Sequence, residues 1–110
     1  MRSVSDVKRD GLITEIKAVA ERLGMRVYVN EPPRTLHSIQ VFNSTIVVYF
    51  YYFTQSMYPH LRALINLLKR YKTYKCEIVI NSDITSTRVL NLLLRLGFTP
   101  DFTGDLVLSL

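Results

Sequence analysis

Residues that could carry out acid–base, nucleophilic or metal chemistry are few and scattered in this sequence. The two histidines, His37 and His60, lie far apart, and neither has a cysteine or a carboxylate pair at metal-ligand spacing. Cys76 is the single cysteine, so no disulfide framework or thiolate metal cluster is expected. The chain also lacks a serine-hydrolase elbow, a Walker loop and a dinucleotide-binding glycine motif. We therefore predict no metal site, and these residues alone assign no catalytic group.

A cluster of basic and aromatic residues is a second place where the sequence could bind a ligand. The cluster consists of Lys69, Arg70, Tyr71, Lys72, Tyr74 and Lys75. Cations beside aromatic rings suit phosphate contact and base stacking, so a basic nucleic-acid-binding module is one hypothesis. A simpler interpretation is that these cations complement the C-terminal dipole of a helix whose apolar face includes Tyr71. The formal net charge of +5 favours acidic partners without choosing among them.

The element that must organise the fold is the run at residues 46–53, which reads Ile-Val-Val-Tyr-Phe-Tyr-Tyr-Phe. It is β-branched first and aromatic after, which favours a strand, and it is too short to cross a membrane as a helix. Both of its alternating faces are apolar. This pattern predicts a strand in the middle of a sheet that is covered on both sides.

The remaining elements follow from hydrophobic periodicity. Helices are predicted at about 5–23, 57–71 and 85–96, and strands at about 25–30, 37–42, 46–53, 75–81, 98–102 and 106–110. Asn43 and Ser44 predict a tight turn and an antiparallel hairpin, whereas the helix before residues 75–81 predicts a parallel neighbour for the central strand. We predict a single α/β (α+β) domain over residues 1–110, with a mixed central sheet flanked by helices on both faces. The expected order is α-β-β-β-α-β-α-β-β.

A pattern at the end of the third predicted helix resembles a known family. The GNAT superfamily of acetyl-CoA-dependent N-acyltransferases commonly ends this helix with a pattern like N-x-x-A-x-x-L-Y-x-K-x-G-F. The matching positions here are Ser86, Val89, Leu92, Leu93, Arg95, Gly97 and Phe98. The leucine, the basic residue and the terminal Gly-Phe agree, and the element order is similar over most of the chain, without the family's first strand. The resemblance implies a GNAT-like fold in which the central strand splays from its parallel neighbour to open a cleft for coenzyme A.

The same resemblance implies a cofactor site directly after the central strand. In active members, a Q/R-x-x-G-x-G/A loop opens a helix, and its backbone N–H groups hold the pyrophosphate of coenzyme A. The corresponding residues are Gln55, Ser56, Met57, Tyr58, Pro59 and His60. Gln55 stands at the first position, but Tyr58 and His60 occupy the glycine places and Pro59 removes a donor. If acetyl-CoA binds, the expected contacts are Gln55, Ser56, Met57, Tyr58 and His60.

The catalytic groups implied by the family are also missing. The family's proton-donating tyrosine corresponds to Leu93, which has no proton to give. Glu31 and Glu77 are the nearest candidates for a base, and surface placement explains both more simply. The leading hypothesis is therefore a small GNAT-like protein that acts by binding a host or partner protein, as some accessory proteins of bacteriophages do, with an exposed tyrosine on a sheet as its anchor. An active acetyl-CoA-dependent N-acyltransferase is the alternative and a nucleic-acid-binding module the second alternative.

The expected location follows from two further observations on the sequence. The first residues, Met-Arg-Ser-Val-Ser-Asp-Val-Lys-Arg-Asp, contain no apolar stretch of the kind found in secretory signals. The longest apolar run is the strand candidate at residues 46–53. We therefore expect a cytoplasmic protein without a membrane partner, in the host cytoplasm if a phage encodes it.

Overall fold

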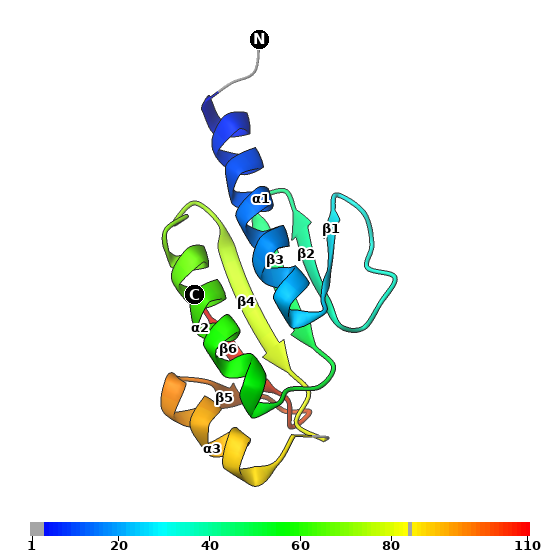
Figure 1. The fold of residues 1–110 in the computed structure, drawn as a ribbon, viewed down its shortest axis with the longest axis vertical. Coiled ribbons are helices and arrows are strands. Elements are labelled where there is room, and N and C mark those ends of the chain that lie inside the picture. The colour runs from blue at the N-terminus through cyan, green and yellow to red at the C-terminus, as the bar shows by residue number, and fades with distance from the viewer. Residues whose placement is uncertain (1–3, 84) are drawn as a thin grey trace.

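In residues 4–83 and 85–110, which the computed structural model describes, the chain forms three α-helices and six β-strands (Figure 1). The helices are α1 (Val4–Leu23), α2 (Tyr58–Lys69) and α3 (Thr87–Leu96), and a 3₁₀ turn, η1 (Gln55–Met57), precedes α2. The strands are β1 (Arg26–Val29), β2 (Ser38–Phe42), β3 (Thr45–Phe50), β4 (Lys75–Ile80), β5 (Thr99–Pro100) and β6 (Leu106–Ser109). This confirms the predicted order of elements, the α+β class and the mixed sheet.

The six strands form one sheet in the order β1-β2-β3-β4-β6-β5. The predicted hairpin is confirmed: β2 pairs antiparallel with β3, and Asn43 takes the left-handed conformation (φ 55°) in the turn between them. The predicted parallel pairing of β3 with β4 is confirmed as well. The remaining pairs are β1 parallel to β2, β4 antiparallel to β6, and β5 antiparallel to β6. Both sheet edges are short strands, which limits pairing with other chains.

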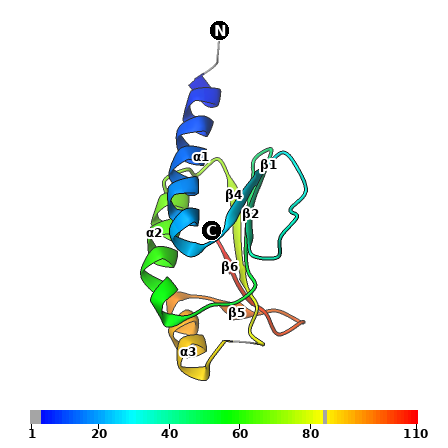
Figure 2. The ribbon, with the colours of Figure 1, turned by 45° about the vertical axis from the view of Figure 1, so that its right-hand side comes forward.

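The prediction that helices cover both faces of the sheet is wrong. All three helices lie on one side of the sheet (Figure 2), and the residues of β3 alternate accordingly. Ile46, Val48 and Phe50 are fully buried, whereas Val47 and Tyr49 on the other side are only half-buried. The sequence prediction failed because it assigned a helix to cover each apolar face.

The connection from β1 to β2 explains why the second face stays open. A right-handed crossover places α2 on one side of the sheet as the chain passes from β3 to the parallel β4. The connection from β1 to β2 crosses the sheet in the same direction, toward β4, but β1 and β2 run antiparallel to β3 and β4. The right-handed rule therefore places this connection on the side of the sheet opposite to α2. It contains Pro32 and Pro33 and forms no helix. It packs against β1, where the Arg34 guanidinium lies 5.6 Å from the centre of the Tyr28 ring.

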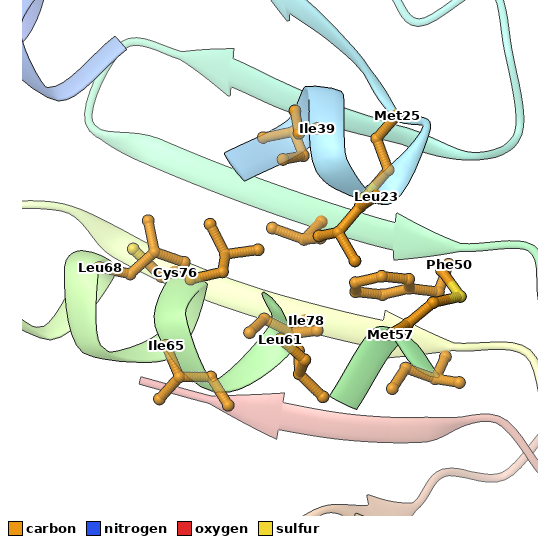
Figure 3. Close-up of a cluster of buried hydrophobic side chains, with 14 of the residues drawn as sticks. Leu23, Met25, Ile39, Phe50, Met57, Leu61, Ile65, Leu68, Cys76 and Ile78 are labelled. Atoms are coloured by element: carbon orange, nitrogen blue, oxygen red, sulfur yellow. The ribbon is translucent and has the colours of Figure 1, made fainter. Parts of the chain in front are cut away.

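The core is a single layer between the helices and the sheet (Figure 3). Leu68 and Leu61 of α2 lie beside Cys76 and Ile78 of β4, and Ile65 of the same helix extends toward β6, at the spacing of an amphipathic helix. From α1, the buried residues are Leu12, Ile16, Ala20 and Leu23. β3 ends at Phe50, earlier than predicted, and Tyr51 and Tyr52 form an exposed bend.

Candidate interaction surface

Two backbone donors of the loop that the family resemblance assigned to coenzyme A are already engaged. In η1, the Met57 N–H donates to the Thr54 carbonyl at 3.0 Å, and the Tyr58 N–H donates to the Gln55 carbonyl. Pro59 has no N–H. A phosphate cradle needs several free backbone donors that converge on the anion. Here two of the three candidates, Met57 and Tyr58, are used within the turn.

The side chains of the same loop do not converge either. Met57 points into the core, where it is 8% exposed and its sulfur accepts a hydrogen bond from the Thr54 N–H at 3.4 Å. The Ser56 hydroxyl pairs with the Thr54 hydroxyl at 2.9 Å. Gln55 and Ser56 are exposed, whereas Tyr58 and His60 are half-buried. The predicted cofactor residues are thus neighbours in one turn without surrounding a common space.

The cleft implied by the resemblance is also missing between the central strands. β3 and β4 remain paired in register from Thr45 and Lys75 to Phe50 and Ile80. The Asn81 N–H then continues the pairing by donating to the Phe50 carbonyl at 2.9 Å. The central strand therefore does not splay from its parallel neighbour over its length, and this expectation is wrong.

The residues behind the tail resemblance have capping and packing roles. The Ser86 hydroxyl caps α3 by accepting from the Val89 N–H at 3.4 Å. Gly97 ends the helix in the left-handed conformation (φ 117°), where a residue with a Cβ is strained. Phe98 and Leu93 are buried in the core. Leu93, at the family's tyrosine position, therefore contacts no solvent-accessible space.

The two carboxylates proposed as a base lie apart from the loop. Glu31 is exposed in the β1–β2 connection and pairs with Arg34 at 3.8 Å. Glu77 is exposed on β4 and belongs to the side of the sheet without helices. The structure thus brings neither carboxylate together with residues 55–60.

His37 has a structural position that the sequence did not reveal. One ring nitrogen, Nε2, lies 3.0 Å from the Leu23 carbonyl at the end of α1, and the other, Nδ1, accepts from the Tyr51 N–H at 3.3 Å. Because a carbonyl can only accept, Nε2 is the donor to Leu23 in this arrangement. The ring also stacks on Tyr52, with centroids 4.6 Å apart. His37 therefore ties the end of α1 to the bend after β3.

The basic and aromatic cluster is divided between two sides of the sheet. On the helix side, the Tyr71 hydroxyl donates to a Glu15 oxygen at 3.0 Å, and Arg70 pairs with Glu15 at 3.5 Å. This hydrogen bond is the main cause of a raised pKa for Tyr71. The Tyr71 and Tyr74 rings are half-buried against the core. Lys75 lies on the opposite side of the sheet, so the cluster does not form one continuous nucleic-acid platform.

The side of the sheet without helices, which we call the open face, carries an apolar row across its centre. Tyr49 of β3 is the neighbour of Val79 on β4, which in turn is the neighbour of Val107 on β6. All three are half-buried. Next to this row lie Gln40, Val47 and Glu77, and beyond them Phe42, Thr45 and Lys75. Phe42 is 51% exposed.

One end of the open face is acidic. Burial raises the pKa of Tyr49 most, and the nearby carboxylates of Asp105 and Asp83 raise it further. Asp105 belongs to the turn between β5 and β6, which Asp101 organises by accepting from the Thr103 N–H at 2.8 Å and the Asp105 N–H at 3.1 Å. These hydrogen bonds, with that from the Thr103 hydroxyl first among them, lower the pKa of Asp101. Tyr51, which follows β3 at this end, is 45% exposed.

The sequence contained a signal for the open face that was assigned to the core. The apolar pattern of residues 46–53 predicts that Val47 and Tyr49 form a second buried side of the central strand. They are instead the largest apolar contribution of β3 to a surface that the chain leaves uncovered. A tyrosine beside apolar neighbours at the surface of a sheet is a feature of interaction sites.

The described part of the chain contains no cluster of three His, Cys, Asp or Glu side chains able to hold a metal ion. Among the same residues, no helix is long and apolar enough to cross a membrane. Comparisons with family models, with curated proteins and with solved structures find no match to this chain.

Proposed function

We propose that this chain is a protein-binding module with a GNAT-like order of elements, and that its open face receives the partner. The observation that carries the proposal is the row of Tyr49, Val79 and Val107, which lies in the middle of the sheet with no helix over it. The central strand places Val47 and Tyr49 on this face, beside the polar Thr45 at its start. A second protein would bury the side chains that this chain leaves at the surface.

The chemistry of the open face favours a partner with both apolar and basic side chains. Tyrosines supply large, rigid contact surfaces, and they are enriched at the energetically dominant positions of interfaces. Asp83 and Asp105 lie close enough to Tyr49 to raise its pKa, so a basic group there would meet two carboxylates and an aromatic ring. This acidic end contrasts with the net charge of +5 for the whole chain. A partner arginine could stack on the Tyr49 ring and pair with the Asp105 carboxylate at the same time.

Acetyl-CoA is not part of this proposal. The Met57 and Tyr58 N–H groups would have to leave their partners in η1 before they could bind a phosphate. A ligand that binds the folded state raises its apparent stability, so thermal unfolding with and without acetyl-CoA tests the alternative directly. We expect no shift of the midpoint. A saturable shift at micromolar acetyl-CoA would favour an N-acyltransferase.

Nucleic acid is also outside the proposal, because the Tyr71 hydroxyl is held by Glu15 and both cluster tyrosines pack against the core. Affinity for single-stranded DNA that falls steeply with salt would be the signature of a nucleic-acid-binding module. We expect no such binding at low salt.

The chain would instead act inside the cell on a host protein, in the manner of small bacteriophage accessory proteins.

The proposal is tested by affinity capture from a lysate of the cells in which the chain acts, with two matched variants. Tyr49→Ala and Leu94→Ala each remove one large apolar side chain, the first from the open face and the second from an exposed site on α3 that is 46% exposed. We expect one protein to be enriched by the native chain and by Leu94→Ala, and lost with Tyr49→Ala. Capture of no protein, or equal capture by both variants, would contradict the proposal.

Self-association is the remaining outcome that must be distinguished. Sedimentation velocity of the purified chain at rising concentration reports whether the open face is already occupied by a second copy. We expect a monomer. A dimer that Tyr49→Ala dissociates would show that the face binds this chain itself and not another protein.

A further inference from the structure

A groove on the helix side of the sheet lies between the last turn of α2 and the end of β6. It has a volume of about 390 Å³, within the usual size range of small-molecule sites. β6 runs behind α2 in Figure 1, and the two elements leave this space between them. Most of the groove's lining belongs to the helix side, where Leu108 on β6 is paired with Ile78, and Ser109 at its margin is paired with Glu77 of the open face.

The floor of the groove is apolar. Leu68 and Cys76 are each 2% exposed, and Leu108 and Leu110 are half-buried against the same core. Burial raises the pKa of the Cys76 thiol, so this side chain is a neutral part of the floor. Tyr71 and Tyr74 also line the groove, with the Tyr71 hydroxyl turned away to Glu15. An alkyl chain would find apolar neighbours along this surface.

The rim of the groove is cationic. Lys69 and Lys72 line it and are both exposed, and neither has a carboxylate partner among the residues that the structure describes. Arg70, the cation between them in the sequence, is instead paired with Glu15 at 3.5 Å. Glu15 therefore neutralises Arg70 and leaves the two lysines for another anion.

We propose that this groove binds a small amphipathic carboxylate, with its alkyl chain on the apolar floor and its carboxylate between Lys69 and Lys72. The match is one of charge and polarity: an apolar floor alone would accept any alkyl group, and two unpaired lysines alone would accept any anion. A ligand that has both parts uses the whole groove. The proposal does not depend on the protein-binding function, because it concerns the opposite side of the sheet.

Lys69 and Lys72 also have a simpler possible role, which is to complement the negative end of the α2 dipole. The two roles predict different results for the same substitutions. If the lysines have a purely structural role, substituting them lowers the midpoint of thermal unfolding and leaves carboxylate affinity unchanged. If they bind the ligand, substituting them lowers carboxylate affinity, with or without a change in the midpoint.

The test is a calorimetric titration of the full chain with octanoate. We expect saturable binding that tightens by about fourfold for each CH₂ added from hexanoate to octanoate, because each buried methylene contributes about 0.8 kcal/mol. Lys69→Gln and Lys72→Gln should each weaken octanoate binding by about two- to fivefold, in line with the strength of exposed ion pairs. Octylammonium, with the opposite charge, should bind far more weakly.

The matched control is Lys75→Gln, which removes a lysine on the opposite side of the sheet. It should leave octanoate affinity unchanged. Methyl NMR with octanoate should shift the signals of Leu68, Leu108 and Leu110 and leave Leu12 of α1 unmoved. No saturable binding, equal binding of octylammonium, or an equal effect of Lys75→Gln would each overturn the proposal. Binding to anionic lipid vesicles without binding of free octanoate would overturn it too, because a membrane surface would then be the ligand.

Discussion

The two faces of β3 both carry β-branched and aromatic residues, but they differ in burial. Ile46, Val48 and Phe50 are fully buried beneath the helices. Val47 and Tyr49 lie on the open face and are only half-buried. The difference comes from the connections of neighbouring strands and not from β3 itself, because a helix follows β3 whereas a proline-containing loop follows β1. An apolar strand face thus indicates a need for cover without saying whether the chain supplies it.

The largest expected contrast between the faces is in folding stability. Phe50→Ala removes a fully buried ring that packs edge-on against Phe53, with the two ring centroids 5.3 Å apart. It should lower the free energy of unfolding by about 3–5 kcal/mol. Tyr49→Ala should cost about 1 kcal/mol, because its ring is already partly in water. Urea denaturation followed by circular dichroism measures both values.

A milder variant keeps the comparison measurable if Phe50→Ala does not fold. Ile78→Val deletes one buried methylene from the covered face of β4 and should cost about 0.5–1.5 kcal/mol. The open-face account is wrong about which side is core if Tyr49→Ala destabilises the chain as much as Phe50→Ala does.

A smaller contrast concerns how α3 is held on the covered face. Gly97 ends α3 at φ 117°, and an added Cβ would lie 3.5 Å from Leu108, an ordinary contact distance. The cost of Gly97→Ala is therefore backbone strain, about 1–2 kcal/mol. Gly11→Ala is the matched control, because Gly11 lies in α1 with open space around it and should gain about 0.5–1 kcal/mol. Thermal unfolding that showed the same sign for both variants would contradict this account of the α3 end.

The effect of pH on Tyr49 should be smaller and confined to alkaline conditions. Burial and the neighbouring carboxylates raise its pKa above the ordinary 10.0, so the fold favours the neutral phenol. A group with a raised pKa in the folded state contributes stability below its ordinary pKa and loses it as the pH rises through the folded value. Above about pH 10, the native chain should therefore lose more stability than Tyr49→Phe does.

Asp105→Asn provides the control for the alkaline experiment, because it removes one of the carboxylates that act on Tyr49. Its stability should fall less steeply than that of the native chain. Parallel pH profiles for the native chain, Tyr49→Phe and Asp105→Asn would indicate that the acidic end of the open face is not in contact with the Tyr49 phenol.

Much of the fold follows from local sequence signals. Asn43 indicates the β2–β3 turn, and the apolar stripe of Leu61, Ile65 and Leu68 indicates the helix that makes β3 and β4 parallel. The parallel pairing of β1 with β2 had no local signal, because Pro32 and Pro33 mark a break and do not specify where the chain returns. The sequence did not predict the uncovered face of the sheet for the same reason. Whether a face is covered depends on the path of segments that are distant in the sequence.

The candidate cofactor site shows a different limit of sequence reasoning. The family resemblance located residues 55–60 at the start of α2, and the structure confirms that they stand there. Whether the Met57 and Tyr58 N–H groups are free depends on the 3₁₀ turn that the chain forms before the helix. Tyr58 and His60 stand where the cofactor-binding pattern has glycines, which argues against a phosphate site, and the hydrogen bonds within the turn argue against it further.

The most direct test of the protein-binding proposal uses the absence of tryptophan from the chain. Tyr51→Trp and Leu94→Trp each place one fluorescent reporter at a matched site, since Tyr51 and Leu94 are 45% and 46% exposed. The captured partner is added to each variant, and acrylamide quenching of the reporter is measured. We predict that the partner protects the tryptophan at position 51 and leaves that at position 94 accessible. Protection at position 94 alone would contradict the assignment of the open face as the binding surface.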